Sequence, residues 1–159
     1  MAAAEAMAEP QAADSAAPPL RYTVFPDTTG QTLKQHSATW PELVEMLRAP
    51  KEWPSKDAMP LIKLATFGVL RTPARRGSDG RVRGNALRHD ANVIAIAGIE
   101  GDYDGEKVSI AEAVRLLERH GIRAIVYSSP SHGVINPPKS HGGPRWRVLA
   151  PMSAEYQPA

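Results

Sequence analysis

The sequence predicts an α+β fold, a small mixed β-sheet with a strand–helix–strand unit at its centre and helices packed on it. An almost unbroken apolar run covers residues 93–99, and a second apolar run covers residues 122–127. Residues 109–121 carry an amphipathic pattern with a serine at its start and a glycine at its end. Such apolar runs are typical of strands buried on both faces, and a helix that connects two strands usually leaves them parallel in one sheet.

Ahead of this unit we expect a leader and the first part of one domain. Residues 1–19 are mostly Ala with Glu, Asp, Gln and Pro. They have little apolar surface to bury, so we expect a disordered leader, with a nascent helix as the alternative. Residues 20–159 are expected to form a single domain, because a chain of 159 residues with 42% hydrophobic content suffices for one core and not for two.

The first part of the domain carries signals for two strands and a helix. Residues 21–25 are expected to be a short strand that Pro26 and the turn at 27–30 close, and residues 62–67 are expected to be a second strand. Thr39 and Glu42 have the spacing of a capping box, which predicts the start of a helix. Trp40 is interpreted as a core anchor of that helix rather than as a base-stacking residue, since a lone tryptophan usually packs.

Residues 71–90 form a basic stretch interrupted by glycines. It holds six arginines and two aspartates. Arginines in a mobile loop suit a polyanion, because each can contact a phosphate and release counterions. The alternative is a solvated loop whose charge keeps the protein soluble. The residues that we expect to bind nucleic acid are Arg75, Arg76, Arg81, Arg83 and Arg88.

Two aspartates follow the central apolar run. Asp102 and Asp104 are two residues apart, so on a strand both carboxylates leave the same face and Tyr103 points away. Neighbouring carboxylates repel unless a cation lies between them, and Mg²⁺ and Mn²⁺ prefer oxygen ligands. The pair therefore predicts a Mg²⁺ or Mn²⁺ site. Glu100 would share the same strand face, either as a third carboxylate for the metals or as a charge turned outward at the strand end. The alternative is a turn and cap role ahead of the helix that Ser109 begins.

A second polar group is expected at the same edge of the sheet. Residues just past the carboxyl ends of two parallel strands lie close together, so Ser129, Ser131 and His132 would face the acid pair. Such an arrangement suits a nucleoside triphosphate, with the metal neutralising phosphate oxygens and His132 donating to one of them. A zinc site from His132 and His141 has no supporting histidine spacing.

A basic strand is expected after residue 144. Arg145 and Arg147 flank Trp146, so on a strand the two arginines share one face and the tryptophan takes the other. The arginines would then point toward the acidic edge, where bound phosphates need them, and Trp146 would pack in the core. The alternative is a salt bridge from Arg147 to Asp102 or Asp104 without any ligand.

Together these motifs resemble the primase-polymerase catalytic domain of the archaeo-eukaryotic primase superfamily, in the versions carried by phages and plasmids. The similarity covers residues 94–152 and consists of Asp-Tyr-Asp at a strand end, Ser-Pro-Ser-His after the next strand and Pro-Arg-Trp-Arg-Val in a later strand. The resemblance implies that Asp102 and Asp104 hold the catalytic metals and that His132 shares in the chemistry. The nucleotide-binding residues that it implies are Ser129, Ser131, His132, Arg145 and Arg147.

The resemblance also implies a biological setting. We expect an RRM-like primase core that carries out template-directed nucleotidyl transfer from nucleoside triphosphates on a single-stranded DNA template, with Mg²⁺ or Mn²⁺ as cofactor. The expected setting is phage or plasmid replication in the cytoplasm of a bacterial host, with a helicase or a C-terminal domain outside this chain as partner.

One feature departs from the family pattern. The family has a third acid on a later strand, whereas the only acid after Arg147 is Glu155, in a polar tail. The chain is then either a piece of a longer protein or catalytically incomplete. Two alternative functions follow: a nucleic-acid-binding replication-accessory domain, and a metal-dependent phosphoesterase that uses the same acids.

Composition argues against several other classes. The chain has no cysteine, which excludes disulfide scaffolds and thiolate metal sites. No apolar run approaches the ~20 residues that a membrane span requires, and we expect no signal peptide. An EF-hand starting at Asp102 fails, because Lys107 and Ala113 occupy the positions that need glycine and glutamate.

Overall fold

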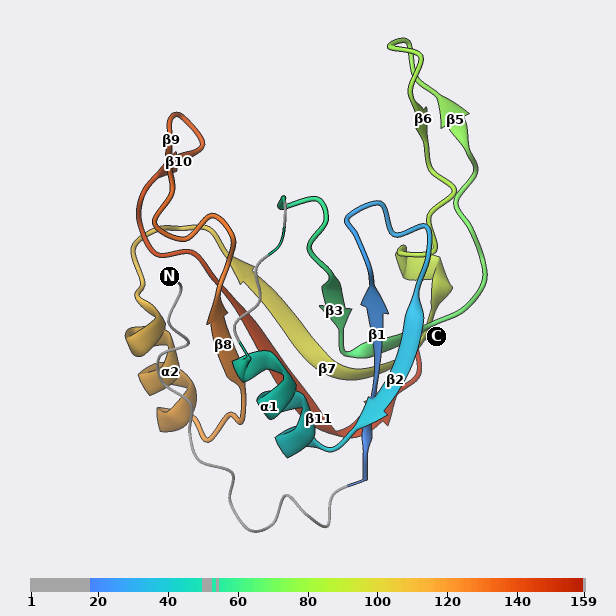
Figure 1. Cartoon of the computed structure of the whole chain (residues 1–159). Coiled ribbons are helices and arrows are strands. Elements are labelled where there is room, and N and C mark those ends of the chain that lie inside the picture. The colour runs from blue at the N-terminus through green and yellow to red at the C-terminus, as the bar shows by residue number, and fades with distance from the viewer. Residues whose placement is uncertain (1–17, 50–52, 54, 159) are drawn as a thin grey trace. The chain divides into compact units, whose positions relative to one another are not determined.

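The structure is a computed structural model that describes residues 18–49, 53 and 55–158, so the predicted leader lies almost entirely outside the described residues. The described chain is an α+β protein rich in strands, which confirms the predicted fold class (Figure 1). It forms two compact units. The first unit holds residues 18–19, 38–49 and 98–152, and the second holds residues 20–37, 53, 55–97 and 153–158.

A three-stranded sheet in the order β2-β1-β3 lies in the second unit. β1 (Leu20–Phe25) confirms the strand predicted at 21–25 and pairs antiparallel with β3 (Leu61–Lys63). β2 (Lys34–Ala38) has no counterpart among the predicted strands, because its sequence Lys-Gln-His-Ser-Ala carries no apolar alternation.

The strand predicted at 62–67 is divided in the structure. β3 ends at Lys63, Leu64 follows, and β4 covers Ala65–Phe67. The division allows a change of partner, since β3 pairs with β1 whereas β4 pairs antiparallel with β7 (Val93–Tyr103). Leu64 is fully buried between the two strands, so an apolar residue occupies the corner that a continuous strand would have crossed.

Aromatic packing fills the core of the second unit. The rings of Phe25 and Phe67 meet edge to face with their centroids 5.1 Å apart, and Ala65 and Leu87 are buried against them. Thr23 is fully buried beside them, and its hydroxyl donates to the carbonyl oxygen of Ala65 at 2.7 Å. The buried hydroxyl is therefore satisfied within the core.

Helix α1 (Trp40–Arg48) of the first unit begins where the sequence predicts. Thr39 Oγ1 accepts the N–H of Glu42, and the Glu42 carboxylate accepts the N–H of Thr39, so the capping box is complete. Trp40 is buried, which confirms it as a core residue. The guanidinium carbon of Arg123 lies 5.7 Å from the centroid of the Trp40 ring.

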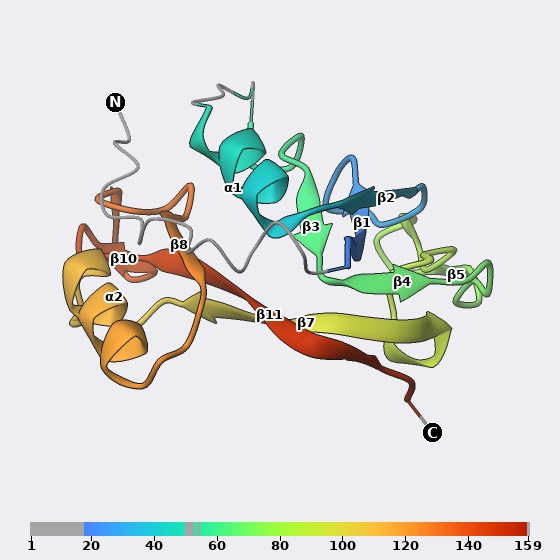
Figure 2. The ribbon, with the colours of Figure 1, turned by 90° about the horizontal axis from the view of Figure 1, so that it is seen from below.

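The first unit also contains the central crossover. Helix α2 (Ile110–Arg119) connects β7 to β8 (Ile125–Ser128) and lies beside β8 (Figure 2). β11 (Trp146–Tyr156) lies between β7 and β8, in the sheet order β4-β7-β11-β8. The sheet is antiparallel, which corrects the predicted mixed sheet. The prediction was wrong because β11 enters between the two strands of the crossover, so that β7 and β8 are not neighbours.

Local signals at the ends of α2 agree with its position. Ser109 Oγ accepts the N–H of Glu112 at 3.2 Å at the start of the helix. At its end Gly121 has φ +63°, and the N–H of Ile122 donates to the carbonyl oxygen of Leu117 at 2.9 Å. This is the left-handed glycine cap that the sequence predicts.

One face of β7 is more open than predicted. Ala95 and Ala97 are buried, but Ile94 and Ile99 are exposed on the same strand. The strand therefore packs against a core on one side only, and its apolar run does not indicate burial on both faces.

Four short strands and one turn of 3-10 helix complete the described elements. They are β5 (Arg75–Arg76), β6 (Val82–Arg83), the 3-10 helix Asp90–Asn92, β9 (Ile135–Asn136) and β10 (Ser140–His141). β5 and β6 form one antiparallel hairpin and β9 and β10 another. Each hairpin extends from its own unit (Figure 1).

Candidate functional site

The predicted acids and arginines meet in the first unit as two ion pairs. Arg147 Nε lies 2.6 Å from Asp102 Oδ1, and an Arg145 terminal nitrogen lies 3.6 Å from Asp104 Oδ1. The aspartate side chains are 63% and 70% exposed, whereas those of Arg147 and Arg145 are only 18% and 15% exposed. The structure therefore places the four residues as neighbours, and in it the acids pair with arginines.

The contact between Arg147 and Asp102 is an ion pair rather than an aligned hydrogen bond. Arg147 Nε is shielded from solvent and has no hydrogen-bond partner among the described residues, although the carboxylate oxygen is close. Tyr127, which is opposite Arg147 in the β8–β11 register, lies in the same charged environment. Burial raises the pKa of the Tyr127 hydroxyl, and nearby Arg147 partly offsets that rise.

Aromatic residues that alternate with these charges fix the turn after β7. The rings of Tyr103 and Trp146 stack with their centroids 4.7 Å apart. Tyr103 Oη accepts the N–H groups of Lys107 and Val108 at 3.0 and 2.9 Å, and Trp146 Nε1 donates to the carbonyl oxygen of Val108 at 2.9 Å. Residues 104–108 are therefore held to the sheet by side chains from both β7 and β11.

Glu106 lies in this turn and is not among the site residues that the sequence predicts. Its carboxylate accepts the Ser140 hydroxyl at 2.7 Å, the His141 N–H at 3.0 Å and Arg145 Nε at 2.8 Å. The side chain is 14% exposed and the backbone has φ +57°. The Ser140 hydroxyl, the His141 N–H and the Arg145 guanidinium lower the pKa of Glu106 to about 2. Because β7 ends at Tyr103, the strand alternation that relates Asp102 and Asp104 does not extend to Glu106, and no local pattern in the sequence predicts its contacts.

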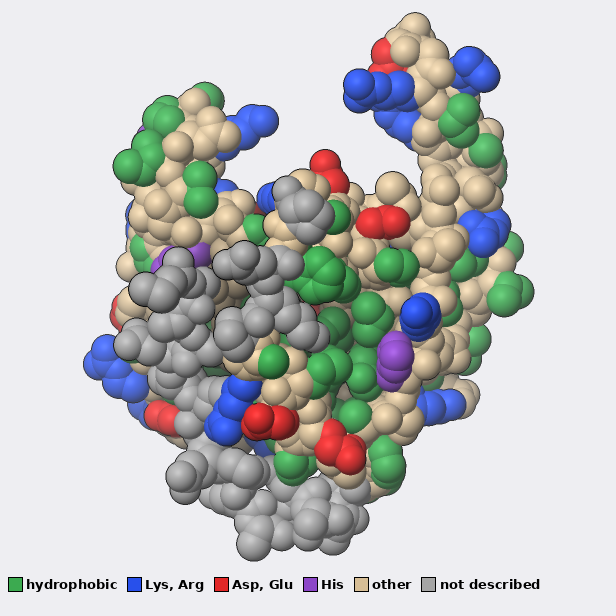
Figure 3. Space-filling view, in the orientation of Figure 1, with side chains coloured by type: hydrophobic (Ala, Val, Ile, Leu, Met, Phe, Trp, Pro, Cys, Tyr) green, Lys and Arg blue, Asp and Glu red, His purple; other side chains and the backbone are tan. Residues whose placement is uncertain are grey.

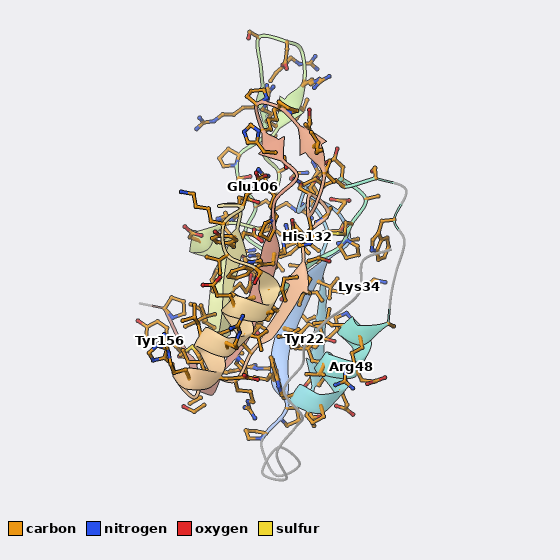
Figure 4. All side chains as sticks on the ribbon, turned by 90° about the vertical axis from the view of Figure 1, so that its left-hand side faces the viewer. Tyr22, Lys34, Arg48, Glu106, His132 and Tyr156 are labelled. Atoms are coloured by element: carbon orange, nitrogen blue, oxygen red, sulfur yellow. The ribbon has the colours of Figure 1, made fainter. Side chains whose placement is uncertain are left out.

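The predicted nucleotide-binding loop contacts the same arginine through its backbone. The N–H of Arg145 donates to His132 Nδ1 at 3.1 Å, and the N–H of Ser129 donates to the carbonyl oxygen of Arg145 at 2.9 Å. The Arg145 carbonyl oxygen also lies 3.0 Å from Nδ1, so this ring nitrogen accepts from or donates to the Arg145 backbone depending on the tautomer. Figure 4 shows Glu106 and His132 near the base of the β9–β10 hairpin.

Two serines of that loop differ in their surroundings. Ser129 Oγ is shielded from solvent and has no hydrogen-bond partner among the described residues. Ser131 is half-buried, and its carbonyl oxygen accepts the N–H of Val134. Unsatisfied buried hydroxyls are uncommon in proteins, which sets Ser129 apart from Ser131 in this loop.

The predicted nucleic-acid-binding arginines divide into free and engaged side chains. Arg75 and Arg81 are exposed on the β5–β6 hairpin and make no side-chain hydrogen bond or ion pair with the described residues, whereas Arg83 pairs with Asp79 at 2.7 Å. Lys and Arg side chains gather at the tip of this hairpin (Figure 3). Arg88 is half-buried and donates to the carbonyl oxygen of Thr28 at 3.0 Å.

Two further arginines of this stretch, Arg76 and Arg71, donate hydrogen bonds to backbone carbonyl oxygens. A terminal nitrogen of Arg76 donates to the carbonyl oxygen of Gly80 at 3.4 Å, which is a weak bond. Arg71 donates to the carbonyl oxygens of Gln31 and Asn85, both at 2.9 Å. The stretch is thus a hairpin anchored by Arg71 and Arg88 rather than the flexible loop that its glycines suggested.

Carboxylate oxygens for the predicted metal come from Asp102 and Asp104, which are exposed and lie at one strand end. Within residues 18–49, 53 and 55–158, no group of three or more His, Asp or Glu side chains has the arrangement of a metal site. Mg²⁺ is usually held by one or two carboxylates together with substrate phosphates. Asp102 and Asp104 would supply the one or two carboxylates of such a site.

Glu155 is placed differently from the prediction. It lies on β11 rather than in a polar tail, and its carboxylate accepts Arg21 Nε at 2.7 Å. Arg21 lowers the pKa of Glu155. Arg21 and Glu155 both belong to the second unit, whereas Asp102 and Asp104 belong to the first.

Neither described helix has the length and apolar character to cross a membrane. Comparisons of the chain with protein-family models, with curated proteins and with solved structures gave no match.

Proposed function

We propose that the first unit binds a nucleoside triphosphate together with Mg²⁺ or Mn²⁺ and serves metal-dependent nucleotidyl transfer. The observation that carries this proposal is the pairing of two exposed carboxylates, Asp102 and Asp104, with two shielded arginines, Arg147 and Arg145. Carboxylates are ligands for a hard cation, and guanidinium groups bind phosphate. The four side chains supply both halves of a metal–triphosphate site.

Binding in this proposal is an exchange of partners. Asp102 and Asp104 would hold the cation, and Arg145 and Arg147 would turn to the phosphates. Every charge then keeps an opposite charge beside it, whereas a cation alone would take its aspartate from each of the two poorly exposed arginines. When bound, the metal would activate the attacking hydroxyl and stabilise the leaving pyrophosphate.

The loop after β8 would position the nucleotide. The Arg145 backbone contacts His132 at Nδ1, so the other ring nitrogen, Nε2, would donate to a phosphate oxygen in its protonated form. Ser129 Oγ, shielded and without a partner among the described residues, would gain one from the nucleotide. Ser131 would line the same loop.

In this proposal the second unit supplies contacts to the template. Arg75 and Arg81 have free guanidinium groups among the described residues and would bind the phosphates of single-stranded DNA. The chain would work as the RRM-like primase core of a phage or plasmid replication protein in a bacterial cytoplasm. A helicase or a C-terminal domain outside this chain would be its partner.

A second candidate is a nucleic-acid-binding accessory domain without catalysis. The same ion pairs favour it, because Arg147 and Arg145 already neutralise the two aspartates. Glu155, the only acid after Arg147, pairs with Arg21 instead of joining them.

Calorimetry distinguishes the two candidates. Mn²⁺-dependent binding of a nucleoside triphosphate is measured for the unaltered chain, for Asp102→Asn with Asp104→Asn, and for Asp57→Asn with Glu118→Gln. The last variant removes the same two charges from exposed positions elsewhere. The proposal expects metal-dependent binding that only the first double variant loses. Binding that is absent, or equal in all three proteins, would leave the accessory domain as the better candidate.

A further inference from the structure

Glu106 collects three donors that come from one segment of the chain. The Ser140 hydroxyl, the His141 N–H and Arg145 Nε all donate to its carboxylate, at 2.7, 3.0 and 2.8 Å. These donors are 34 to 39 residues away in the sequence. One partly buried carboxylate therefore joins the turn after β7 to the segment that leads into β11.

Arg145 is held on three sides. Its Nε donates to Glu106, one terminal nitrogen donates to the carbonyl oxygen of Lys139, and the other lies 3.6 Å from Asp104 Oδ1. The Glu106 contact is close enough for a charge-assisted hydrogen bond, and the Asp104 contact is too long for one. Glu106 thus binds the arginine more tightly than Asp104 does.

Close packing preserves this arrangement. A Cβ atom at Gly143 would lie 2.5 Å from the Cβ of Glu106 and 2.7 Å from its carbonyl oxygen. The segment before Arg145 consequently passes directly over Glu106 with room only for glycine. Both the close approach of the Gly143 backbone and the hydrogen bonds to its carboxylate therefore hold Glu106 in place.

We propose that Glu106 is a positioning residue that holds Arg145 at the phosphate-binding edge, an inference that rests on the proposed function. A guanidinium paired only with Asp104 would lose its partner when that acid takes the cation. Glu106 keeps Arg145 bonded through Nε and leaves the terminal nitrogen near Asp104 to bind a phosphate. Pre-organisation of this kind lowers the cost of ordering a side chain on binding.

A double-mutant cycle tests the inference by measuring Mn²⁺–triphosphate affinity. Glu106→Gln is expected to weaken affinity by about tenfold, as for other residues that orient a binding group. In an Arg145→Ala background, the same substitution should have no further effect. Glu106→Asp, which keeps the charge, should recover part of the affinity. Glu118→Gln, an exposed acid on α2, is the control and should bind as the unaltered chain does.

An NMR measurement on Arg145 adds a readout that loss of folding alone would not mimic. The Arg145 Nε–H should exchange slowly with solvent in the unaltered chain and quickly in Glu106→Gln, while amide signals of α2 stay unchanged. Equal affinity losses with and without Arg145, or an unchanged Nε–H, would overturn the inference and leave the proposed function standing. No binding by the unaltered chain would overturn the proposed function and this role together.

Discussion

At the scale of single residues, the two ion pairs that Asp102 and Asp104 form should contribute little to stability. Exposed ion pairs contribute about 0–1 kcal/mol to stability, and the aspartates of both pairs are largely exposed. Glu106 differs, because three donors surround its poorly exposed carboxylate. It is the acid whose protonation should affect folding most clearly.

The low pKa of Glu106 predicts a defined dependence of stability on pH. Its donors lower the pKa from 4.5 to about 2, so the ionised carboxylate favours the folded state. This contribution should be complete above about pH 4.5 and should disappear as pH falls to about 2. Urea unfolding across this range should show a steeper loss of stability for the unaltered chain than for Glu106→Gln. If the free energy of unfolding fell equally with pH in the two proteins, the hydrogen bonds assigned to the Glu106 carboxylate would be contradicted.

The sequence predicts some of these residues and not others for a physical reason. Asp102 with Asp104, and Arg145 with Arg147, follow from the alternation of a strand, which is a local rule. Glu106 depends on a turn with φ +57° and on donors more than thirty residues away. No local pattern encodes such contacts.

At the scale of elements, helix ends were more predictable than strand partners. The caps at Thr39, Ser109 and Gly121 lie where the sequence predicts, because each depends on a few neighbouring residues. Strand partners depend on distant segments. That is why the strand predicted at 62–67 is divided and why β11, predicted as a short basic strand, separates β7 from β8.

Two glycines allow a comparison between backbone strain and steric conflict. At Gly121 an added Cβ has open space and only the positive φ opposes it, so Gly121→Ala should cost about 1 kcal/mol. At Gly143 the added Cβ would meet the Glu106 backbone at 2.7 Å. Gly143→Ala should therefore destabilise the chain more, and it should also speed exchange of the Arg145 Nε–H, which Gly121→Ala should not. Equal effects of the two substitutions would show that the approach at Gly143 is not tight.

At the scale of the whole molecule, the two proposed binding surfaces belong to different compact units. The acid–arginine edge lies in the first unit and the β5–β6 hairpin in the second. Their chemistry also differs, since the arginines of the edge are paired with Asp102 and Asp104, whereas Arg75 and Arg81 of the hairpin make no ion pair with the described residues. Triphosphate binding and DNA binding should therefore be separable by substitution.

Arg75→Ala with Arg81→Ala should weaken binding of a single-stranded oligonucleotide and leave Mn²⁺–triphosphate affinity unchanged. If both side chains bind phosphates, the slope of log affinity against log salt should fall by about 1.4, or about 0.7 for each arginine removed. Arg71→Ala is the matched control, because its guanidinium donates to the Gln31 and Asn85 carbonyls and its loss should lower stability without changing the slope.

Asp102→Asn with Asp104→Asn should show the reverse pattern, with triphosphate binding abolished and the oligonucleotide slope retained. An unchanged slope in the Arg75 and Arg81 variant would remove the hairpin from the DNA-binding surface, because a side chain that releases no counterion does not bind a phosphate.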